Sequence, residues 1–374
     1  MATRICFVTK ELFAWGKYGG FGKYVRLVSR ELIKRGFEVC AVIPRSENQA
    51  SLEDLDGVIV FGLPYPTSLL DSVPSELVAR TCASYLYSKC RADIYHSVNP
   101  SFYTLLAKLG RPSAKHLIAF SDLRDMHDWR RIATISSEAA VHNKIRGLPV
   151  ESQFLKRVVK QADGFYAKAD FLAEKAVKMY GLDSRPPIVR HPIEAPRRNM
   201  KKSDQPVVCF LGRLDPVKRP WVYFELARKF PQTQFCVMGQ TTVPSKYAPL
   251  IKAFSSLSNL KFLGWTFGER KSRILEKSWI LINTSIHEAL PVAFLEAWSH
   301  ECAVLSGANP DGLVNKYGCY VPDGDFARGL QHLIGNNLWE KKGKAGRQYV
   351  ETHHDVRSNI ERLIEIYHTI LTEP

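Results

Sequence analysis

Short apolar runs alternate with longer amphipathic stretches along almost the whole chain, and this alternation limits the fold more than any other feature. It is typical of βαβ units, in which helices connect the parallel strands of one sheet. Strands are predicted at 5–9, 38–43, 57–63, 93–98, 115–120 and 164–169, with helices at 21–36, 74–89, 151–162 and 170–180. In the first helix, Val25, Val28 and Leu32 fall on one face. This part therefore predicts a Rossmann-like domain.

A second series of the same kind follows residues 184–206, which are rich in proline and basic residues and have little periodicity. Its strands are predicted at 207–213, 233–239, 260–265, 279–285 and 303–307. The last segment places Ile360, Leu363, Ile364 and Tyr367 on one helical face, which must pack against another element. We predict an α/β protein of two doubly wound domains. They comprise residues 1–190, a linker at 191–206, residues 207–352, and a C-terminal helix at 353–374 that packs back on the N-terminal domain.

The composition, 45% hydrophobic and 24% charged over 374 residues, is that of a globular protein and excludes disorder, collagen and coiled coil. The eight cysteines form no CxxC pair and no metal-ligand spacing with histidine, which favours free thiols in a reducing compartment. No run approaches the about 20 apolar residues of a membrane span, and the apolar run between Arg4 and Lys10 is too short for a signal peptide. We expect a cytoplasmic protein, free or peripheral at a membrane.

Basic residues outnumber acidic ones by 52 to 37, and residues 1–200 hold 30 of the former and 20 of the latter, or +10 of the net +15. Such a field attracts nucleic acid, anionic lipid or diphosphates, although it can also serve only solubility. In segments 122–133 and 142–160 the basic side chains are mixed with apolar ones. They include Arg130, Arg131, Lys144, Arg146, Lys156, Arg157 and Lys160. This pattern fits a membrane-surface patch or helices with one solvated basic face.

The loops that follow the strands are the candidate sites, since open α/β sheets bind ligands there. The first, at 15–24, is rich in glycine and precedes a helix, so its backbone N–H groups could hold an anion. It is not a P-loop, because the spacing from Gly16 to Gly22 is one residue too long and Tyr24 replaces the Ser/Thr that binds magnesium. Turn chemistry alone is the other interpretation.

Two loops of the second series carry charged side chains. Arg213 and Lys218 follow a strand and could bind a phosphorylated ligand, with Pro220 in the first turn of the next helix. Glu288 and Glu296 flank Pro291, which we expect to start a helix. This arrangement puts a carboxylate near each end of an extended ligand and free N–H groups between them. Solvated surface charge is the alternative for each.

Three further features have ordinary explanations as well as functional ones. Asp323-Gly324-Asp325 has the form of a DxD metal motif, but we expect a turn. His96 follows a strand start, where it could reach a ligand or be a satisfied internal histidine. His116 lies at the beginning of a strand and is expected to be structural.

The order of these motifs resembles that of the retaining glycosyltransferases of family 4, which have the GT-B fold. GGFGKYVRLVSRELIKRGFEV is similar to their glycine loop and first helix, ADIYHS to a strand signature, and LKFLGW…WILINTSIHEALPVAFLEA to their donor site. The resemblance covers nearly the whole chain. It implies two Rossmann-like domains facing across a cleft, with the N-terminal domain binding the acceptor and the C-terminal domain a nucleotide-sugar.

The resemblance also implies residue roles. Arg213 and Lys218 would neutralise the diphosphate, Glu296 would bind the ribose, and Glu288 would lie near the sugar. The donor set also includes Gly19, Gly20, Leu290, Pro291 and Val292, and the sugar or acceptor side includes His96, Ser121 and Asp122. Neither a metal nor a cofactor is then needed.

This chain departs from the family at three places. Ser121 stands where many members have a histidine, Pro291 replaces a glycine, and His191-Pro192 replaces asparagine-glycine. The expected function is metal-independent transfer from a nucleotide-diphosphate sugar to a saccharide or lipid-linked acceptor. Alternatives are a sugar-nucleotide 2-epimerase, a non-catalytic member, or a basic nucleic-acid-binding protein. The last is disfavoured because no RRM, KH, zinc-finger or helix-turn-helix pattern is present.

Overall fold

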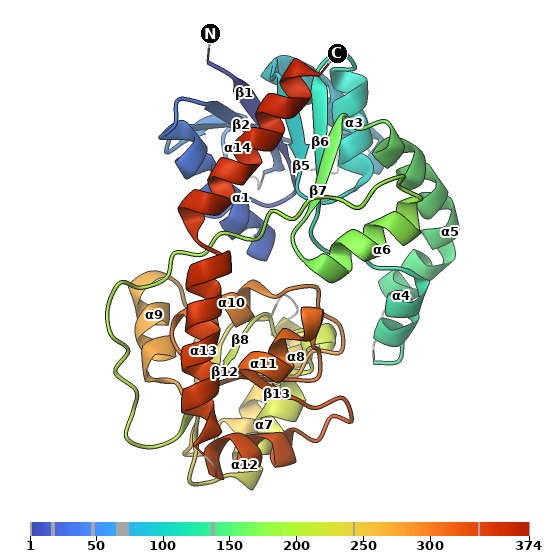
Figure 1. Ribbon diagram of the computed structural model, residues 1–374. Coiled ribbons are helices and arrows are strands. Elements are labelled where there is room, and N and C mark those ends of the chain that lie inside the picture. The colour runs from blue at the N-terminus through green and yellow to red at the C-terminus, as the bar shows by residue number, and fades with distance from the viewer. Residues whose placement is uncertain are drawn as a thin grey trace. The chain divides into compact units, whose positions relative to one another are not determined.

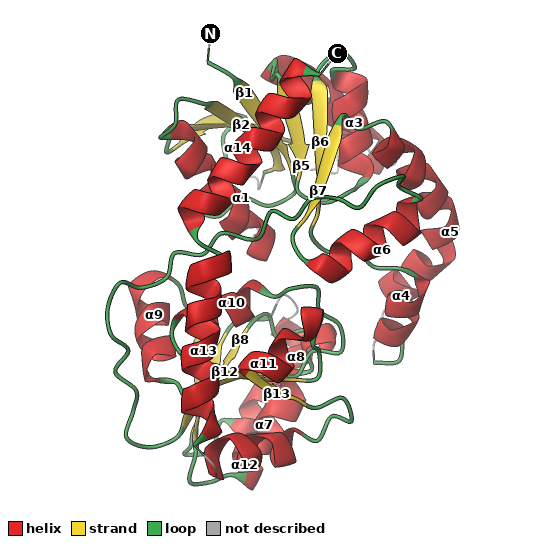
Figure 2. Ribbon diagram, viewed as in Figure 1, coloured by secondary structure: helices red, strands yellow, loops and turns green. Residues whose placement is uncertain are grey.

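The computed structural model describes residues 2–15, 19–45, 49–64, 75–135, 139–241, 244–335 and 337–373 (Figure 1). The chain forms two compact units. The first comprises Met1–Leu123, Leu148–Pro192 and Val356–Pro374, and the second Arg124–Gly147 and Ile193–Asp355. The segment Arg124–Gly147 thus packs with the second unit, although the sequence-based boundary places it in the first. In each unit, helices flank a sheet (Figure 2).

The first unit contains a seven-stranded sheet in the order β3-β4-β2-β1-β5-β6-β7. Its strands are β1 (Arg4–Val8), β2 (Glu38–Pro44), β3 (Leu52–Leu55), β4 (Val58–Leu63), β5 (Ile94–Ser97), β6 (Lys115–Phe120) and β7 (Gly164–Ala167). All neighbours pair in parallel except β3 and β4, which are antiparallel. Without the edge strand β3, the order is that of a doubly wound Rossmann sheet.

The two faces of this sheet are buried under different helices. Ile5 and Phe7 of β1 join a core with α1 (Gly20–Ile33) and α14 (Val356–Thr372), whereas Cys6 and Val8 join one with α2 (Ser75–Cys90) and α3 (Phe102–Gly110). This follows from the two-residue period of a strand. Helix α6 (Asp170–Tyr180) also belongs to this unit, whereas α4 (Met126–Ala133) belongs to the second unit. Helix α5 (Ala139–Lys160) begins in the second unit and ends in the first.

The C-terminal helix α14 belongs to the core of the first unit. Ile360, Leu363, Tyr367 and Ile370 are at most 3% exposed and pack with β1 and α1. Figure 1 shows α14 lying beside α1 on the first sheet. The apolar face that the sequence displays at helical spacing is therefore the face that is buried.

The second unit contains a six-stranded sheet in the order β10-β9-β8-β11-β12-β13, in which every neighbouring pair is parallel. Its strands are β8 (Val207–Leu211), β9 (Gln234–Met238), β10 (Leu260–Gly264), β11 (Ile280–Asn283), β12 (Ala303–Ser306) and β13 (Gly318–Tyr320). Its helices are α7 (Pro220–Lys229), α8 (Pro244–Phe254), α9 (Gly268–Lys277), α10 (Val292–Ser299), α11 (Leu313–Tyr317), α12 (Phe326–Gly335) and α13 (Leu338–His353). This sheet also has the Rossmann order.

Sequence patterning does not identify β3, β13 or α3. Strand β3 has the sequence LEDL and is largely exposed, so it has no apolar run. Strand β13 is only three residues long, and its Gly318 passes so close to β12 that a Cβ would lie 1.8 Å from the carbonyl oxygen of Val304. Both are edge strands, whose pairing depends on tertiary context.

Two sequence expectations concern the whole chain. In the part that the structure describes, no helix is long and apolar enough to cross a membrane. All eight cysteines are free thiols, as the absence of paired spacings predicts.

Candidate active site

The candidate donor site lies in the second unit, where β8 and β11 are neighbours. The chain leaves these two strands toward opposite sides of the sheet, and such a switch point opens a crevice at the carboxyl ends of the strands. The loops that start there are 212–219 and 284–291. Gly239, directly after β9, lies against the first loop. A Cβ at this position would lie 1.8 Å from the carbonyl oxygen of Gly212, so a side chain does not fit there.

Hydrogen bonds hold the two loops together. The Thr284 hydroxyl donates to the carbonyl oxygens of Lys218 (2.6 Å) and Arg219 (2.9 Å), and Arg219 Nε donates to the carbonyl of Thr284 (2.6 Å). Asp215 caps the short helix that contains Lys218 by accepting from its backbone N–H (3.1 Å). Helix α7 begins at Pro220, as predicted.

Lys218 and Glu288 form the central ion pair of the site. Lys218 Nζ lies 2.5 Å from Glu288 Oε1, and the two side chains are 21% and 8% exposed. Asn283 Nδ2 (2.9 Å) and the Ser285 hydroxyl (2.6 Å) donate to the same oxygen. Burial raises the pKa of Glu288, but the Lys218 charge and these hydrogen bonds outweigh it and hold the pKa below its usual range. Glu288 is therefore an ionised, fixed carboxylate.

Arg213 is the exposed cation of the same loop. Its side chain is 58% exposed, and Nε lies 3.2 Å from Asp215 Oδ2. A surface pair of this kind contributes little to stability. The Arg213 guanidinium can therefore turn toward an anionic ligand at small cost.

The loop after Glu288 leads into α10, whose first helical residue is Val292 with Pro291 as the N-cap. The helix thus starts one residue later than predicted. Leu290 and Val292 are half-buried and pack on the core of this unit. Glu296, one turn further along, lies 2.5 Å from Lys271 Nζ of α9, and both side chains are less than 15% exposed. Glu296 is thus paired and half-buried, which excludes a freely solvated position.

In the first unit, the N-terminus of α1 already holds a carboxylate. Glu11 Oε2 accepts from the backbone N–H of Gly19 (2.7 Å) and of Gly22 (3.3 Å). Gly19 is the N-cap and Gly20 the first helical residue. Residues 16–18 of the glycine loop lie outside the described residues. Two of the backbone N–H groups that the sequence offers to an anion, those of Gly19 and Gly22, therefore already donate to Glu11.

Ser121 and Asp122 lie directly after β6, at the carboxyl end of the first sheet. Asn99 Oδ1 accepts from both backbone N–H groups (3.1 and 3.0 Å), and its Nδ2 donates to the carbonyl of Asp122 (3.0 Å). The Ser121 hydroxyl donates to the carbonyl of Val98 at 2.6 Å. These hydrogen bonds fix the conformation of Ser121 and Asp122, and Ser121 is 8% exposed.

His96 lies inside the first unit rather than at its surface. Its exposed fraction is 0%, and its Nδ1 and Nε2 bond the hydroxyls of Tyr367 (2.7 Å) and Tyr166 (3.0 Å). Burial and the charge of Lys168 lower its pKa to about 3. The Lys168 ammonium lies 3.1 Å from the centroid of the Tyr24 ring. His96 is therefore a neutral internal histidine that connects β5 to α14.

Asp323-Gly324-Asp325 forms a turn, which confirms the prediction. Gly324 has a φ of 78°, and the N–H of Asp325 donates to Asp323 Oδ1 (3.1 Å). Arg328 Nη2 donates to Asp323 Oδ2 at 2.5 Å. The two carboxylates therefore cap and pair with the start of α12.

Sequence reasoning missed five residues of these sites, namely Glu11, Asn99, Lys271, Asn283 and Ser285. Asn283 and Ser285 lie just before Glu288, so their position in the loop was a usable signal. Lys271 lies 25 residues from Glu296 on another helix, and no local pattern connects them.

Two family models match the chain, one after the other. Residues 18–195 match Glycosyltransferase Family 4, and residues 193–315 match Glycosyl transferases group 1. Among curated proteins, the D-inositol 3-phosphate glycosyltransferase of Mycolicibacterium smegmatis is 23% identical over 242 residues, which is 60% of this chain and 55% of that protein. The chain thus spans about half the length of this relative.

Solved structures agree in fold. The sucrose-phosphate synthase of Thermosynechococcus elongatus has a TM-score of 0.77 at 15% identity, over 98% of this chain and 99% of its own. WaaG, a glycosyltransferase involved in lipopolysaccharide biosynthesis, has a TM-score of 0.71 at 15% identity, over 97% and 99%. The protein therefore has the GT-B fold of glycosyltransferases. It belongs to the family 4/group 1 glycosyltransferases, whose two models together match residues 18–315.

Proposed function

We propose that the protein transfers a sugar from a nucleotide-diphosphate sugar to a saccharide or lipid-linked acceptor, with retention of the anomeric configuration. The observation that carries the proposal is the Lys218–Glu288 ion pair at the switch point of the second sheet. A cation and a fixed carboxylate at that position suit a ligand with a diphosphate at one end and hydroxyls at the other.

The charges of this site match the charge that develops during transfer. The bond between the anomeric carbon and a diphosphate oxygen breaks, and the diphosphate keeps the electron pair. The acceptor oxygen bonds the anomeric carbon and gives up its proton to the departing diphosphate. Lys218 and the exposed Arg213 stabilise the departing diphosphate in this proposal. When Lys218 turns to the phosphate, Asn283 and Ser285 still hold Glu288 for the sugar hydroxyls.

Glu296 is assigned to the ribose. Its Oε1 is paired with Lys271, which orients the carboxylate, and ribose hydroxyls would donate to that carboxylate. Leu290, Pro291 and Val292 supply the backbone between the two carboxylates, and the free N–H groups at the start of α10 add positive potential there.

Catalysis is proposed to need no metal ion. Lys218 and Arg213 supply the positive charge at the diphosphate, and Asp323 is already paired with Arg328. A hard cation such as Mg²⁺ or Mn²⁺ requires several oxygen ligands together, and the carboxylates of the donor site are each paired with a lysine.

The acceptor is assigned to the first unit. Ser121 and Asp122, which Asn99 holds in place at the end of β6, would contact the acceptor or the transferred sugar. His96 is a positioning residue in this scheme, because its ring nitrogens are bonded to two tyrosines. Gly19 and Gly20 would contribute backbone N–H groups to the diphosphate, which requires the Glu11 carboxylate to leave Gly19.

The two site glutamates are expected to affect different parts of the donor. Glu296→Gln should weaken binding of the nucleoside diphosphate and of the nucleotide-sugar equally, because a ribose contact does not involve the sugar. Glu288→Gln should spare the nucleoside diphosphate and impair transfer. Calorimetric titration of each variant with both ligands measures the difference. Identical titration curves of the nucleoside diphosphate with wild type and Glu296→Gln would show that the roles are wrong.

A membrane-borne acceptor would gain from the basic helices. Arg130 and Arg131 on α4, and Lys156 and Arg157 on α5, are exposed. We expect reversal of these four charges to weaken binding to anionic liposomes while hydrolysis of the donor continues. The effect should fade in high salt, as the Debye length shrinks from about 10 Å at 0.1 M to about 3 Å at 1 M. Variants that sediment with liposomes like wild type at low salt would show that these helices are only solvated.

A further inference from the structure

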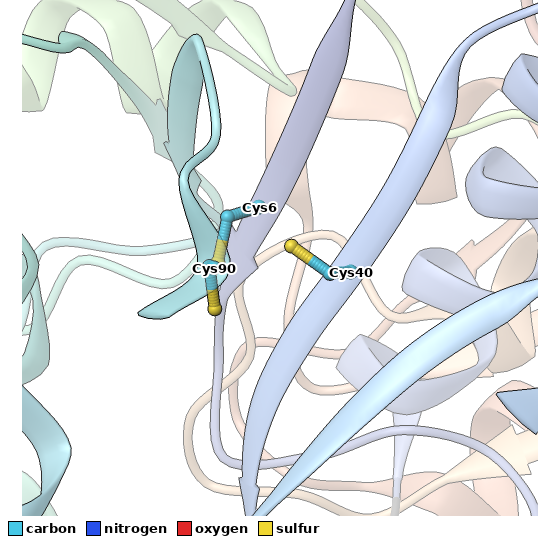
Figure 3. A group of neighbouring side chains, drawn as sticks. All are labelled: Cys6, Cys40 and Cys90. Atoms are coloured by element: carbon cyan, nitrogen blue, oxygen red, sulfur yellow. The ribbon is translucent and has the colours of Figure 1, made fainter. Parts of the chain in front are cut away.

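Three cysteines that are far apart in sequence meet inside the first unit. Cys6 and Cys40 are register partners on the parallel strands β1 and β2, so their side chains leave the sheet on the same face. Cys90 is the last residue of α2, which covers that face. Figure 3 shows the side chains of Cys6, Cys40 and Cys90 gathered in one place. The three sulfur atoms all lie within 4.8 Å of one another.

The group is dry and consists only of sulfur ligands. Cys6, Cys40 and Cys90 are 0%, 3% and 1% exposed, and they belong to an apolar core with Val8, Val42 and other residues. One edge is nevertheless close to solvent, since α2 ends at Cys90 and the next residue, Arg91, is exposed. An ion could therefore reach the thiols through this helix end without unfolding of the sheet.

The spacing fits a metal ion better than a disulfide. For sulfur–metal bonds of about 2.3 Å, three sulfurs around one ion lie about 4.0 Å apart. The sulfur atoms of the three cysteines lie within 4.8 Å of one another, so each sulfur–sulfur distance needs to shorten by less than about 1 Å to reach that geometry. The two sulfurs of a disulfide are only about 2.05 Å apart, and that bond also requires an oxidant.

We propose that Cys6, Cys40 and Cys90 form a site for one thiophilic metal ion of the zinc and monovalent-copper class. Each bound thiol releases its proton to solvent, and the positive ion makes burial of the sulfur charge tolerable. Soft sulfur ligands select this class over Mg²⁺ or Mn²⁺. The ion would connect β1, β2 and α2, on the core of the first unit and apart from the donor-site residues, so this proposal does not rest on the proposed transfer.

The test is titration of the reduced full-length chain with Cd²⁺ under anaerobic conditions, because cadmium–thiolate bonds absorb in the ultraviolet. The expected result is one tightly bound Cd²⁺ per chain, unaffected by Mg²⁺. Cys6→Ser, Cys40→Ser and Cys90→Ser should each lose most of the absorption band. Cys82→Ser, half-buried on α2 beside the same core, should keep it.

Two results would overturn the proposal. One is a wild-type chain with no Cd²⁺ band and no rise of its unfolding temperature when Cd²⁺ is added, which needs no variant at all. The other is a band that survives in all three folded serine variants, which would place the ion on other thiols. Where a serine variant does not fold, the corresponding alanine variant replaces it, since serine adds a polar hydroxyl to an apolar core.

Discussion

Replacing Lys218 by alanine will lower kcat/KM about 100- to 1000-fold, because loss of one electrostatic stabiliser of developing charge costs about 2.7–4 kcal/mol in the transition state. Arg213→Ala should have an effect of the same kind. Folding should be affected far less. Thr284 bonds the backbone carbonyl of Lys218 rather than its side chain, and Asn283 and Ser285 continue to donate to Glu288.

Steady-state kinetics with the preferred nucleotide-sugar, together with urea unfolding, separates the two effects. Arg228→Ala is the matched control, since Arg228 is an exposed arginine on α7 that pairs with Glu225 and lies over the Phe254 ring, outside the two donor-site loops. It should keep wild-type turnover. If both the Lys218→Ala and Arg213→Ala enzymes turn over close to wild type, the donor-site assignment is wrong.

The free energy of unfolding should fall as the pH falls from about 6.5 toward 3, in part because of His96. Its pKa is lowered to about 3 by burial and by Lys168, whereas an unfolded histidine has a pKa of about 6.5. Between these values the unfolded chain binds a proton that the folded chain does not. This group alone therefore contributes a slope of about 1.4 kcal/mol per pH unit, and its stabilising effect is fully present only above pH 6.5.

Urea unfolding of wild type and His96→Gln at a series of pH values isolates this slope. Glutamine retains a donor and an acceptor for the two tyrosines but does not titrate. His300, whose pKa is lowered to about 4 by burial, contributes with the same sign in both proteins and cancels in the comparison. We expect the pH dependence to be shallower in the variant. Parallel lines for the two proteins would contradict the assignment of His96 as a buried neutral group.

The sequence was most informative where a pattern is local. The period of the apolar runs predicts the central strands and α1 within a few residues, because buried parallel strands are nearly continuous apolar runs. The same reasoning locates Arg213, Lys218 and Glu288, since the loops after these strands must lie at the ligand-binding edge. The pattern of apolar runs does not predict β3, because the sequence LEDL contains no such run. This strand forms by antiparallel pairing with β4.

The rest of the site depends on residues that are distant in sequence. Lys271, on another helix, forms an ion pair with Glu296. The Glu11 carboxylate, in the preceding loop, accepts a hydrogen bond from the backbone N–H of Gly19. The three clustered cysteines have no metal-binding spacing, because β1, β2 and the end of α2 are brought together only by the sheet order. His96 could be read as a ligand or as a core residue, and only the positions of Tyr166 and Tyr367 decide.

The central claim is that the second unit binds a nucleotide-diphosphate sugar through its own cations. The most direct test is thermal unfolding of the protein with UDP-, GDP- and ADP-sugars, each in the presence of EDTA. At about 100 times its dissociation constant, the matching donor adds roughly 2.7 kcal/mol to the stability, so one series should raise the unfolding temperature clearly. Lys218→Ala should lose most of that rise. No shift with any of the three, or a shift that EDTA abolishes and Mg²⁺ or Mn²⁺ restores, would contradict the account.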